Sequence, residues 1–218
     1  MKIDVLTLFP EMFSPLDFSI IKRARDKGII SINLYNIRDF SKDIHRRVDD
    51  YPYGGGSGMV MAADPIYNAV GYLKDNSDLK PRVILMSPEG RKYNQEAAKE
   101  LSKEEYLILI CGEIAAMAVI DSTCRLVPGV LSSKDSYEEE SFYNGLLEYP
   151  QYTRPEEYNG MKVPEVLLSG YHEKIRLWRR CQSLKKTLLL RPDIIDFEKL
   201  SDEDKKILKS IESGNEKI

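Results

Sequence analysis

The sequence lacks the long apolar run that a membrane-spanning helix needs. No stretch approaches the roughly eighteen apolar residues required to cross a bilayer. The N-terminus "MKIDVLTLFPEMF" carries acidic residues close to its single lysine, unlike a signal peptide. With 42% hydrophobic and 31% charged residues among 218, the composition is typical of a globular protein in water. We therefore expect a cytoplasmic location and no membrane partner.

Cysteine and histidine are scarce. The three cysteines, Cys111, Cys124 and Cys181, are far apart, and there are only two histidines. This distribution provides no metal-ligand spacing, so we expect no metal and no disulfide. Cys111 and Cys124 lie in apolar surroundings that predict a packing role.

The chain also lacks an overall positive charge, because its formal net charge is −3. Its basic residues are nevertheless concentrated, with seven of them and one acid between Tyr171 and Arg191. Such a stretch is usually a solvated helix face. Contact with nucleic-acid phosphates is the alternative.

Short apolar strands alternate with helical patterns along the first half of the chain. The predicted strands are 2–9, 31–37, 82–87 and 106–111, and the predicted helices between them are 15–27, 65–73 and 95–102. This order predicts an α/β fold, mainly a parallel sheet with helices on both faces. An apolar helix at 113–126 and a long helix at 171–190 follow. We expect an α/β domain at 1–130, a flexible linker at 131–160 and a small helical domain at 161–218.

The densest glycine segment, "YPYGGGSGM" at 51–59, fits no nucleotide-binding motif. No lysine follows the glycines as a phosphate-binding P-loop requires, and Met59 replaces the last glycine of a dinucleotide fingerprint. A flexible turn is one interpretation. The flanking "RRVDD" with Tyr51 and Tyr53 favours contact with RNA, because bases stack on aromatic rings and arginine pairs with phosphate.

Three further segments each have a structural and a functional interpretation. The turn "SPEG" after the strand at 82–87 is either an ordinary connection or a ligand wall. Asp121 and Arg125 are four residues apart on a helix, which predicts an ion pair, or an arginine oriented toward a site. The acidic "YEEES" at 137–141 is either a solvated loop or, among its apolar neighbours, the location of a general base.

Taken together, the segments "LFPEMF", "RRVDDYPYGGGSGMVM", "SPEGRKYNQ", "AAMAVIDSTCRLVPGVL", "EEESFYNGLLEYPQYTRPEEYNGMKVPEVLLSGYHEKIRLWRR" and "LRPDII" resemble the bacterial tRNA (guanine-N1)-methyltransferases, of the SPOUT class of knotted methyltransferases. The resemblance covers nearly the whole chain. It implies a trefoil-knotted α/β domain, a helical C-terminal domain and a homodimer. It also implies transfer of a methyl group from S-adenosylmethionine to N1 of guanosine 37 in tRNA.

The resemblance assigns roles to individual residues. It implies that Glu140, in place of the family's aspartate, is the general base, and that Arg125 stabilises charge on guanine O6. The residues implied to bind the cofactor are Met86, Ser87, Pro88, Gly90 and Gly112. Those implied to hold tRNA are Asp50, Tyr53, Gly55, Gly56, Arg176, Arg179 and Arg180.

The chain departs from the family directly after Gly112, where roughly thirty residues of the cofactor-binding knot region are absent. Either the protein carries this segment and the numbering from 1 to 218 omits it, or the segment is deleted. We favour the first. In the second case a buried strand is lost and S-adenosylmethionine should not bind. A catalytically inactive tRNA-binding protein is therefore the alternative function. An α/β enzyme with another cofactor is weakened by the failed nucleotide motifs.

Overall fold

The computed structural model describes residues 1–54, 57–131 and 140–213 and divides the chain into two compact units. The first is Met1–Ser133 and the second is Lys134–Ile218. The linker over 131–160 stays a prediction. Residues 132–139 of it lie outside the described part of the chain, and residues 140–160 fall within the second unit.

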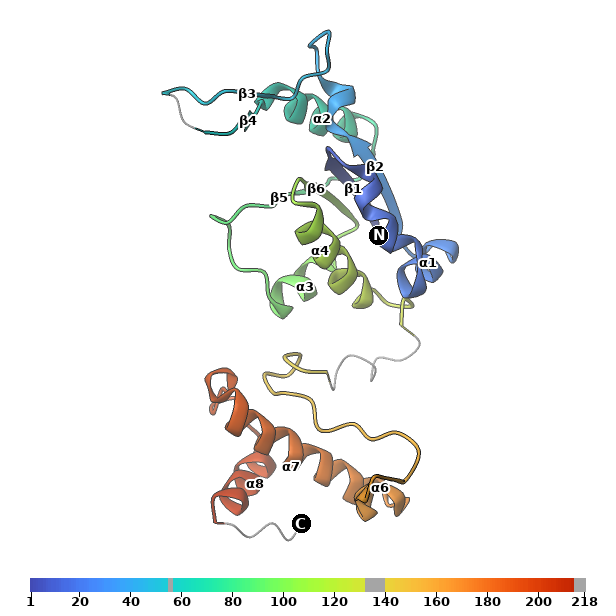
Figure 1. Cartoon of the computed structure of the whole chain (residues 1–218). Coiled ribbons are helices and arrows are strands. Elements are labelled where there is room, and N and C mark those ends of the chain that lie inside the picture. Colours follow the sequence, from blue (N-terminus) through green and yellow to red (C-terminus); the bar gives the residue numbers. More distant parts are fainter. Residues whose placement is uncertain (55–56, 132–139, 214–218) are drawn as a thin grey trace. The chain divides into compact units, whose positions relative to one another are not determined.

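The first unit is built on a four-stranded parallel sheet (Figure 1). The strand order is β2-β1-β6-β5, and the four strands are β1 (Lys2–Thr7), β2 (Ser31–Asn36), β5 (Arg82–Leu85) and β6 (Tyr106–Ile110). All five residues of β6 are buried, as expected of a central strand that is covered on both faces. The predicted α/β fold with a mainly parallel sheet is confirmed.

Helices cover both faces of this sheet because side chains alternate along each strand. Ile3 and Val5 of β1 pack in one core cluster, whereas Leu6 belongs to the cluster on the other face. The first face is covered by η1 (Pro10–Asp17), α1 (Ser19–Asp26), α3 (Gln95–Leu101) and α4 (Glu113–Arg125). The second is covered by η2 (Ile37–Phe40) and α2 (Ala63–Asp75).

The passage from β6 to α4 consists of only two residues, and both have left-handed backbone conformations. Cys111 has φ 59° and Gly112 has φ 62°. A positive φ is unusual for a residue other than glycine, so this junction is under local strain. The 218-residue sequence is continuous through it. The preferred expectation, that the protein has the additional segment, is therefore wrong for this chain.

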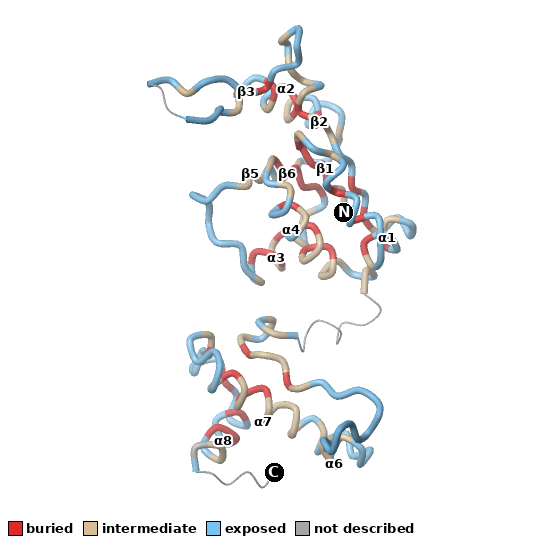
Figure 2. The backbone as a smooth tube through the Cα atoms, viewed as in Figure 1, coloured by how far each residue is buried: buried red, intermediate tan, exposed pale blue. Residues whose placement is uncertain are grey.

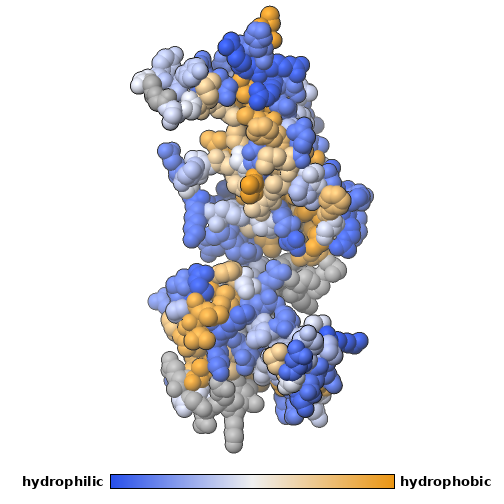
Figure 3. All heavy atoms as spheres, in the orientation of Figure 1, coloured by the Kyte–Doolittle hydropathy of each residue, from blue (hydrophilic) through white to orange (hydrophobic). Residues whose placement is uncertain are grey.

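Apolar side chains reach the surface next to this junction. β5 is an edge strand in which Val83 is 39% and Leu85 60% exposed, and Ile114 at the start of α4 is 73% exposed. Figure 3 shows hydrophobic residues on the surface in the region of β5, β6 and α4. The predicted apolar helix at 113–126 corresponds to α4, which is buried only on the side facing the sheet.

The second unit is a helical assembly around a small core. Among its described residues the elements are β7 (Glu157–Tyr158), β8 (Met161–Lys162), α6 (Glu165–Leu168), α7 (His172–Leu190), η3 (Pro192–Ile194) and α8 (Asp202–Glu212). Leu184 of α7 packs with Ile207 of α8 and with Leu146 of the preceding segment. Figure 2 shows buried positions on all three stretches.

The segment before α6 is attached to α7 by side-chain hydrogen bonds. The Thr187 hydroxyl accepts from the Leu147 backbone N–H at 2.8 Å, and Ser183 donates to the Leu147 carbonyl. Lys186 donates to the Glu148 carbonyl at 3.0 Å. These contacts fix the backbone on both sides of Leu147, close to the predicted base Glu140.

No helix in the described residues is both long and apolar enough to span a bilayer. The same part of the chain contains no cluster of three His, Cys, Asp or Glu side chains suited to a metal ion.

Candidate active site

Four of the predicted cofactor-binding residues form a tight turn at the carboxyl end of β5. The Met86 N–H bonds the Ile110 carbonyl at 3.1 Å, which continues the β5–β6 pairing by one residue. The Ser87 hydroxyl accepts from the Glu89 N–H at 3.2 Å, and the Gly90 N–H bonds the Ser87 carbonyl at 3.1 Å. Pro88 lies inside this turn, which therefore stands at the sheet edge where ligands of open α/β sheets bind.

The structure places Gly112 against this turn. A Cβ at Gly112 would lie 2.8 Å from the Met86 Cβ, which is too close for any side chain. The carboxyl ends of β5 and β6 are thus in direct contact.

A pocket for a nucleoside-containing methyl donor needs an apolar surface and several convergent polar groups. Met86, Ser87, Pro88 and Gly90, with the exposed Leu85 and Ile114, fit one wall of such a pocket. The two-residue junction leaves little chain to form the opposite wall.

The predicted catalytic Arg125 is the last residue of α4. Its guanidinium makes two hydrogen bonds to Asp121, Nε–Oδ2 at 2.9 Å and Nη2–Oδ1 at 3.1 Å. The expected ion pair is therefore present, and it fixes the direction of the arginine. At 1.5 Å per residue, Arg125 lies about 20 Å along the helix from Gly112. Within the first unit, the structure does not bring Arg125 to the cofactor wall.

Glu140 lines a cavity of about 440 Å³ in the second unit. Its backbone carbonyl accepts from the Tyr143 N–H at 3.2 Å, so it begins a turn. Three predicted tRNA-binding residues share this cavity, namely Arg176, Arg179 and Arg180. The structure thus brings the predicted base together with the three arginines.

Two of these arginines are held by acidic residues of α8. Arg180 makes a bidentate pair with the buried Asp204, at 2.6 and 2.8 Å. Arg176 bonds Glu173 of its own helix and Glu203 of α8. Hydrogen bonding from Arg180 lowers the pKa of Asp204 to about 2. The basic face expected from the sequence is therefore largely charge-matched at these two positions.

Arg179 is held differently, with its guanidinium 4.8 Å from the centre of the Tyr149 ring. Arginine stacked on an aromatic face is an arrangement that proteins use in nucleic-acid recognition. Arg179 lines both the Glu140 cavity and a larger neighbouring cavity.

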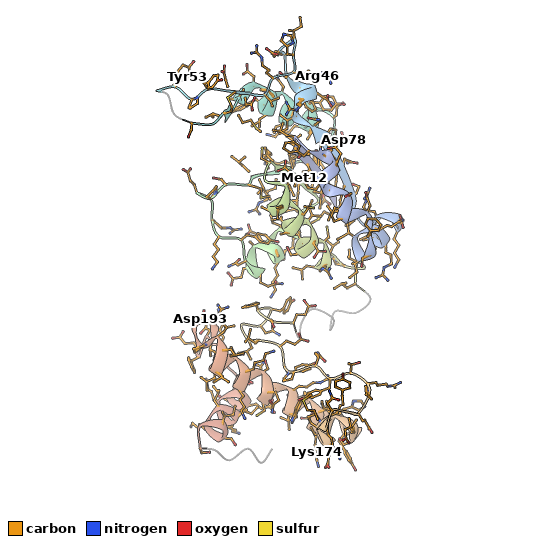
Figure 4. All side chains as sticks on the ribbon, viewed as in Figure 1. Met12, Arg46, Tyr53, Asp78, Lys174 and Asp193 are labelled. Carbon is orange, nitrogen blue, oxygen red and sulfur yellow. The ribbon has the colours of Figure 1, made fainter. Side chains whose placement is uncertain are left out.

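The glycine-rich segment forms an extension beyond a two-residue ladder between β3 (Asp49–Asp50) and β4 (Val60–Met61). Asp50 accepts from the Tyr51 N–H at 2.8 Å, and the Tyr53 side chain is fully exposed. Figure 4 shows Tyr53 far out on this extension. Gly55 and Gly56 lie outside the described residues.

Sequence reasoning missed three polar residues of the Glu140 cavity, His172, Asn144 and Ser183. The helical spacing of His172, Arg176, Arg179 and Ser183 places them on one stripe of α7, so a 3.6-residue periodicity search could have found His172. Asn144 lies in an irregular turn, where no periodicity applies.

A family model for tRNA (Guanine-1)-methyltransferase TrmD matches residues 1–113 and 107–197. A tRNA (guanine-N(1)-)-methyltransferase of Clostridium botulinum (strain Langeland) is 53% identical over 96% of this chain and 98% of its own length. The protein of the same name from Dictyoglomus turgidum is 51% identical over 97% and 96%. That of Clostridium novyi is 54% identical over 95% and 97%.

The alignments also locate the difference between this chain and its relatives. The first alignment spans 236 positions, whereas 96% of this chain is about 209 residues, so about 27 positions are occupied only in the relative. The family model matches in two stretches that overlap at residues 107–113, which places this difference at the β6–α4 junction. With that one shortened junction, the chain belongs to the tRNA (guanine-N1)-methyltransferase family.

Proposed function

We propose that this protein transfers a methyl group from S-adenosylmethionine to N1 of guanosine 37 in tRNA. The observation that carries the proposal is the 53% identity to a named tRNA (guanine-N(1)-)-methyltransferase over 96% of this chain. The relatives' names do not favour the alternative of an inactive tRNA-binding protein. The physical argument for that alternative is the shortened junction, and it is tested below.

In this proposal Glu140 is the general base. Its carboxylate takes the proton from guanine N1, and the nitrogen lone pair then forms the bond to the methyl carbon while the carbon–sulfur bond of the donor breaks and its electron pair returns to sulfur, leaving a neutral thioether. The arginines that line the cavity with Glu140 support this role, because guanidinium groups beside the base can contact the phosphates of the bound RNA. The attachment of residues 146–148 to α7 supports the positioning that proton transfer requires.

Arg125 is proposed to stabilise the negative charge that develops on guanine O6 as N1 loses its proton. The bidentate pair with Asp121 supports this role, since it restricts the guanidinium to one orientation. Arg125 and Glu140 belong to different units. Catalysis therefore requires tRNA to engage both units, of one chain or of two chains in a homodimer.

The methyl donor is proposed to lie against Met86, Ser87, Pro88 and Gly90, beside Gly112. When bound, it supplies an electrophilic methyl group on a positively charged sulfur. The turn after β5 and the exposed Leu85 and Ile114 support this placement. From the deletion after Gly112 we expected no binding of S-adenosylmethionine. Because one wall of the pocket is present and the opposite wall is shortened, we propose that the donor binds weakly.

The tRNA contacts are proposed to involve the extension with Asp50, Tyr53, Gly55 and Gly56 and the α7 arginines. A homodimer in the cytoplasm completes the proposal, as the family resemblance implies.

The experiment is a methyl-transfer assay with donor carrying a labelled methyl group and tRNA with guanosine at position 37. We expect label in N1-methylguanosine after digestion to nucleosides, and none with matched tRNA carrying adenosine at 37. If tRNA binds but no label is transferred at saturating donor, the proposed function is wrong and the inactive alternative applies.

A further inference from the structure

A second cavity lies beside the Glu140 cavity within the second unit. It has a volume of about 940 Å³ and runs along residues 149–156, with an apolar floor that includes Val163, Leu167 and Ile175. Tyr149, Ile175 and Arg179 line both cavities, so the stacked Tyr149–Arg179 pair separates them. Nothing in the proposed methyl transfer uses this space.

The walls of this cavity combine aromatic rings with positive charge. Tyr152 is 47% exposed, and its ring packs 6.3 Å from the ring of Trp178 on α7. Arg154 and Arg179 contribute guanidinium groups, against the single acid Glu156. Aromatic faces next to arginine are the features by which proteins bind unpaired nucleotides, with bases stacked and phosphates paired.

We propose that this cavity is a nucleobase-binding subsite for an unpaired RNA nucleotide. The base would stack on Tyr152, and its phosphate would pair with Arg154. This inference rests on the proposed function, since a nucleotide here would be a neighbour of the guanosine that enters the Glu140 cavity. Because stacking on a tyrosine face tolerates any base, the subsite positions the strand without reading its sequence.

The chain contains its own reporter for this test. Trp178 is the only tryptophan, and it contacts Tyr152. The probe is a five-nucleotide single-stranded RNA, added to the full chain without methyl donor. We expect it to change Trp178 fluorescence, whereas the same RNA in a duplex and guanosine monophosphate should act only at about tenfold higher concentration.

Two variants and one matched control separate this subsite from general RNA affinity. We expect Tyr152→Ala and Arg154→Ala each to weaken binding of the single strand about tenfold. Tyr152→Phe keeps the aromatic face and should bind the single strand as tightly as the unaltered chain. Tyr158→Ala removes an exposed tyrosine that does not line the cavity and should leave binding unchanged. Because Arg154 is exposed, its variant tests the subsite even if Tyr152→Ala unfolds.

The proposal is overturned if the single strand leaves Trp178 fluorescence unchanged, or if Arg154→Ala binds as tightly as the unaltered chain. Equal weakening by Tyr158→Ala would also overturn it. The readout involves no methyl transfer. An inactive enzyme that shows the expected binding pattern would contradict the proposed function and leave this subsite standing.

Discussion

The two units of this protein differ in how completely each presents its predicted site. In the second unit, a segment attached to α7 surrounds a cavity where Glu140 meets three arginines. In the first unit, the wall predicted for the methyl donor faces a two-residue junction with left-handed backbone at Cys111 and Gly112, at the point where relatives have about 27 more positions. A chain can therefore be highly identical to its relatives over nearly its whole length and still have a well-formed base cavity beside a shortened donor pocket.

The strongest way to break this comparison is to remove the proposed base. We expect Glu140→Gln to lower methyl transfer about a thousandfold, because the amide cannot accept the N1 proton. The matched control is Glu148→Gln, whose carboxylate accepts from Gln151 and does not line the cavity. Equal rates for the two variants, measured with saturating tRNA, would show that the Glu140 cavity is not catalytic.

A second change tests Arg125 against its structural interpretation. We expect Arg125→Ala to lower the rate about a hundredfold through the lost stabilisation of O6. An exposed helical ion pair contributes only about 0.5 kcal/mol to the free energy of unfolding, so the melting temperature should hardly move. Arg25→Ala, which breaks an exposed pair with Asp17, is the control. Equal methyl-transfer rates for the two variants would show that Arg125 has only a structural role, as the partner of Asp121.

A third change probes the strained junction directly. Gly112→Ala should reduce the free energy of unfolding by about 2 kcal/mol, because its φ is 62° and the new Cβ would lie 2.8 Å from the Met86 Cβ. Gly71→Ala is the control, since it lies in α2 with no atom within 4 Å of its Cβ, and it should be neutral or stabilising. Both variants are measured by denaturant unfolding. Equal free energies of unfolding for Gly112→Ala and Gly71→Ala would mean that the junction is not tightly packed.

The smallest effect concerns the charge-matched helices of the second unit. Because the pKa of Asp204 is about 2 in the folded protein, below its ordinary 3.8, unfolding takes up a proton between these values. The stabilisation by Asp204 is therefore complete above about pH 4 and is lost as the pH falls toward 2. We expect Asp204→Asn to cost about 1 kcal/mol at pH 7 and much less at pH 2.

Asp202→Asn, an exposed neighbour in the same turn, is the control for this pH series. A cost for Asp204→Asn that did not change between pH 7 and pH 2 would contradict the proposed role of the Arg180 pair.

Much of the fold was predictable because buried parallel strands appear as apolar runs. The strand at 106–111 and the helices at 95–102 and 171–190 were found within one or two residues of β6, α3 and α7. The exposed side of α4 was not, because the apolarity of Ile114 does not reveal whether anything covers it. Sequence patterns indicate which faces are apolar, and only the packed chain shows which are buried.

The candidate site shows the same limit. The arginines of α7 were identified from their clustering, but their pairing with Glu203 and Asp204 was not. Those acids lie 27 and 24 residues further along the chain, and only tertiary packing brings them together. The pairing of Arg125 with Asp121 was predictable because four residues separate them on one helix.

The most direct test of the central claim is the affinity for S-adenosylmethionine, measured by calorimetry on two proteins. One is this chain, and the other carries the roughly 27-residue segment of the Clostridium botulinum relative inserted between Gly112 and Glu113. We expect donor binding at least tenfold tighter with the insertion, and the same affinity for tRNA in both proteins. Equal donor affinity in the two proteins would mean that the short junction already forms a complete donor site, contrary to our proposal.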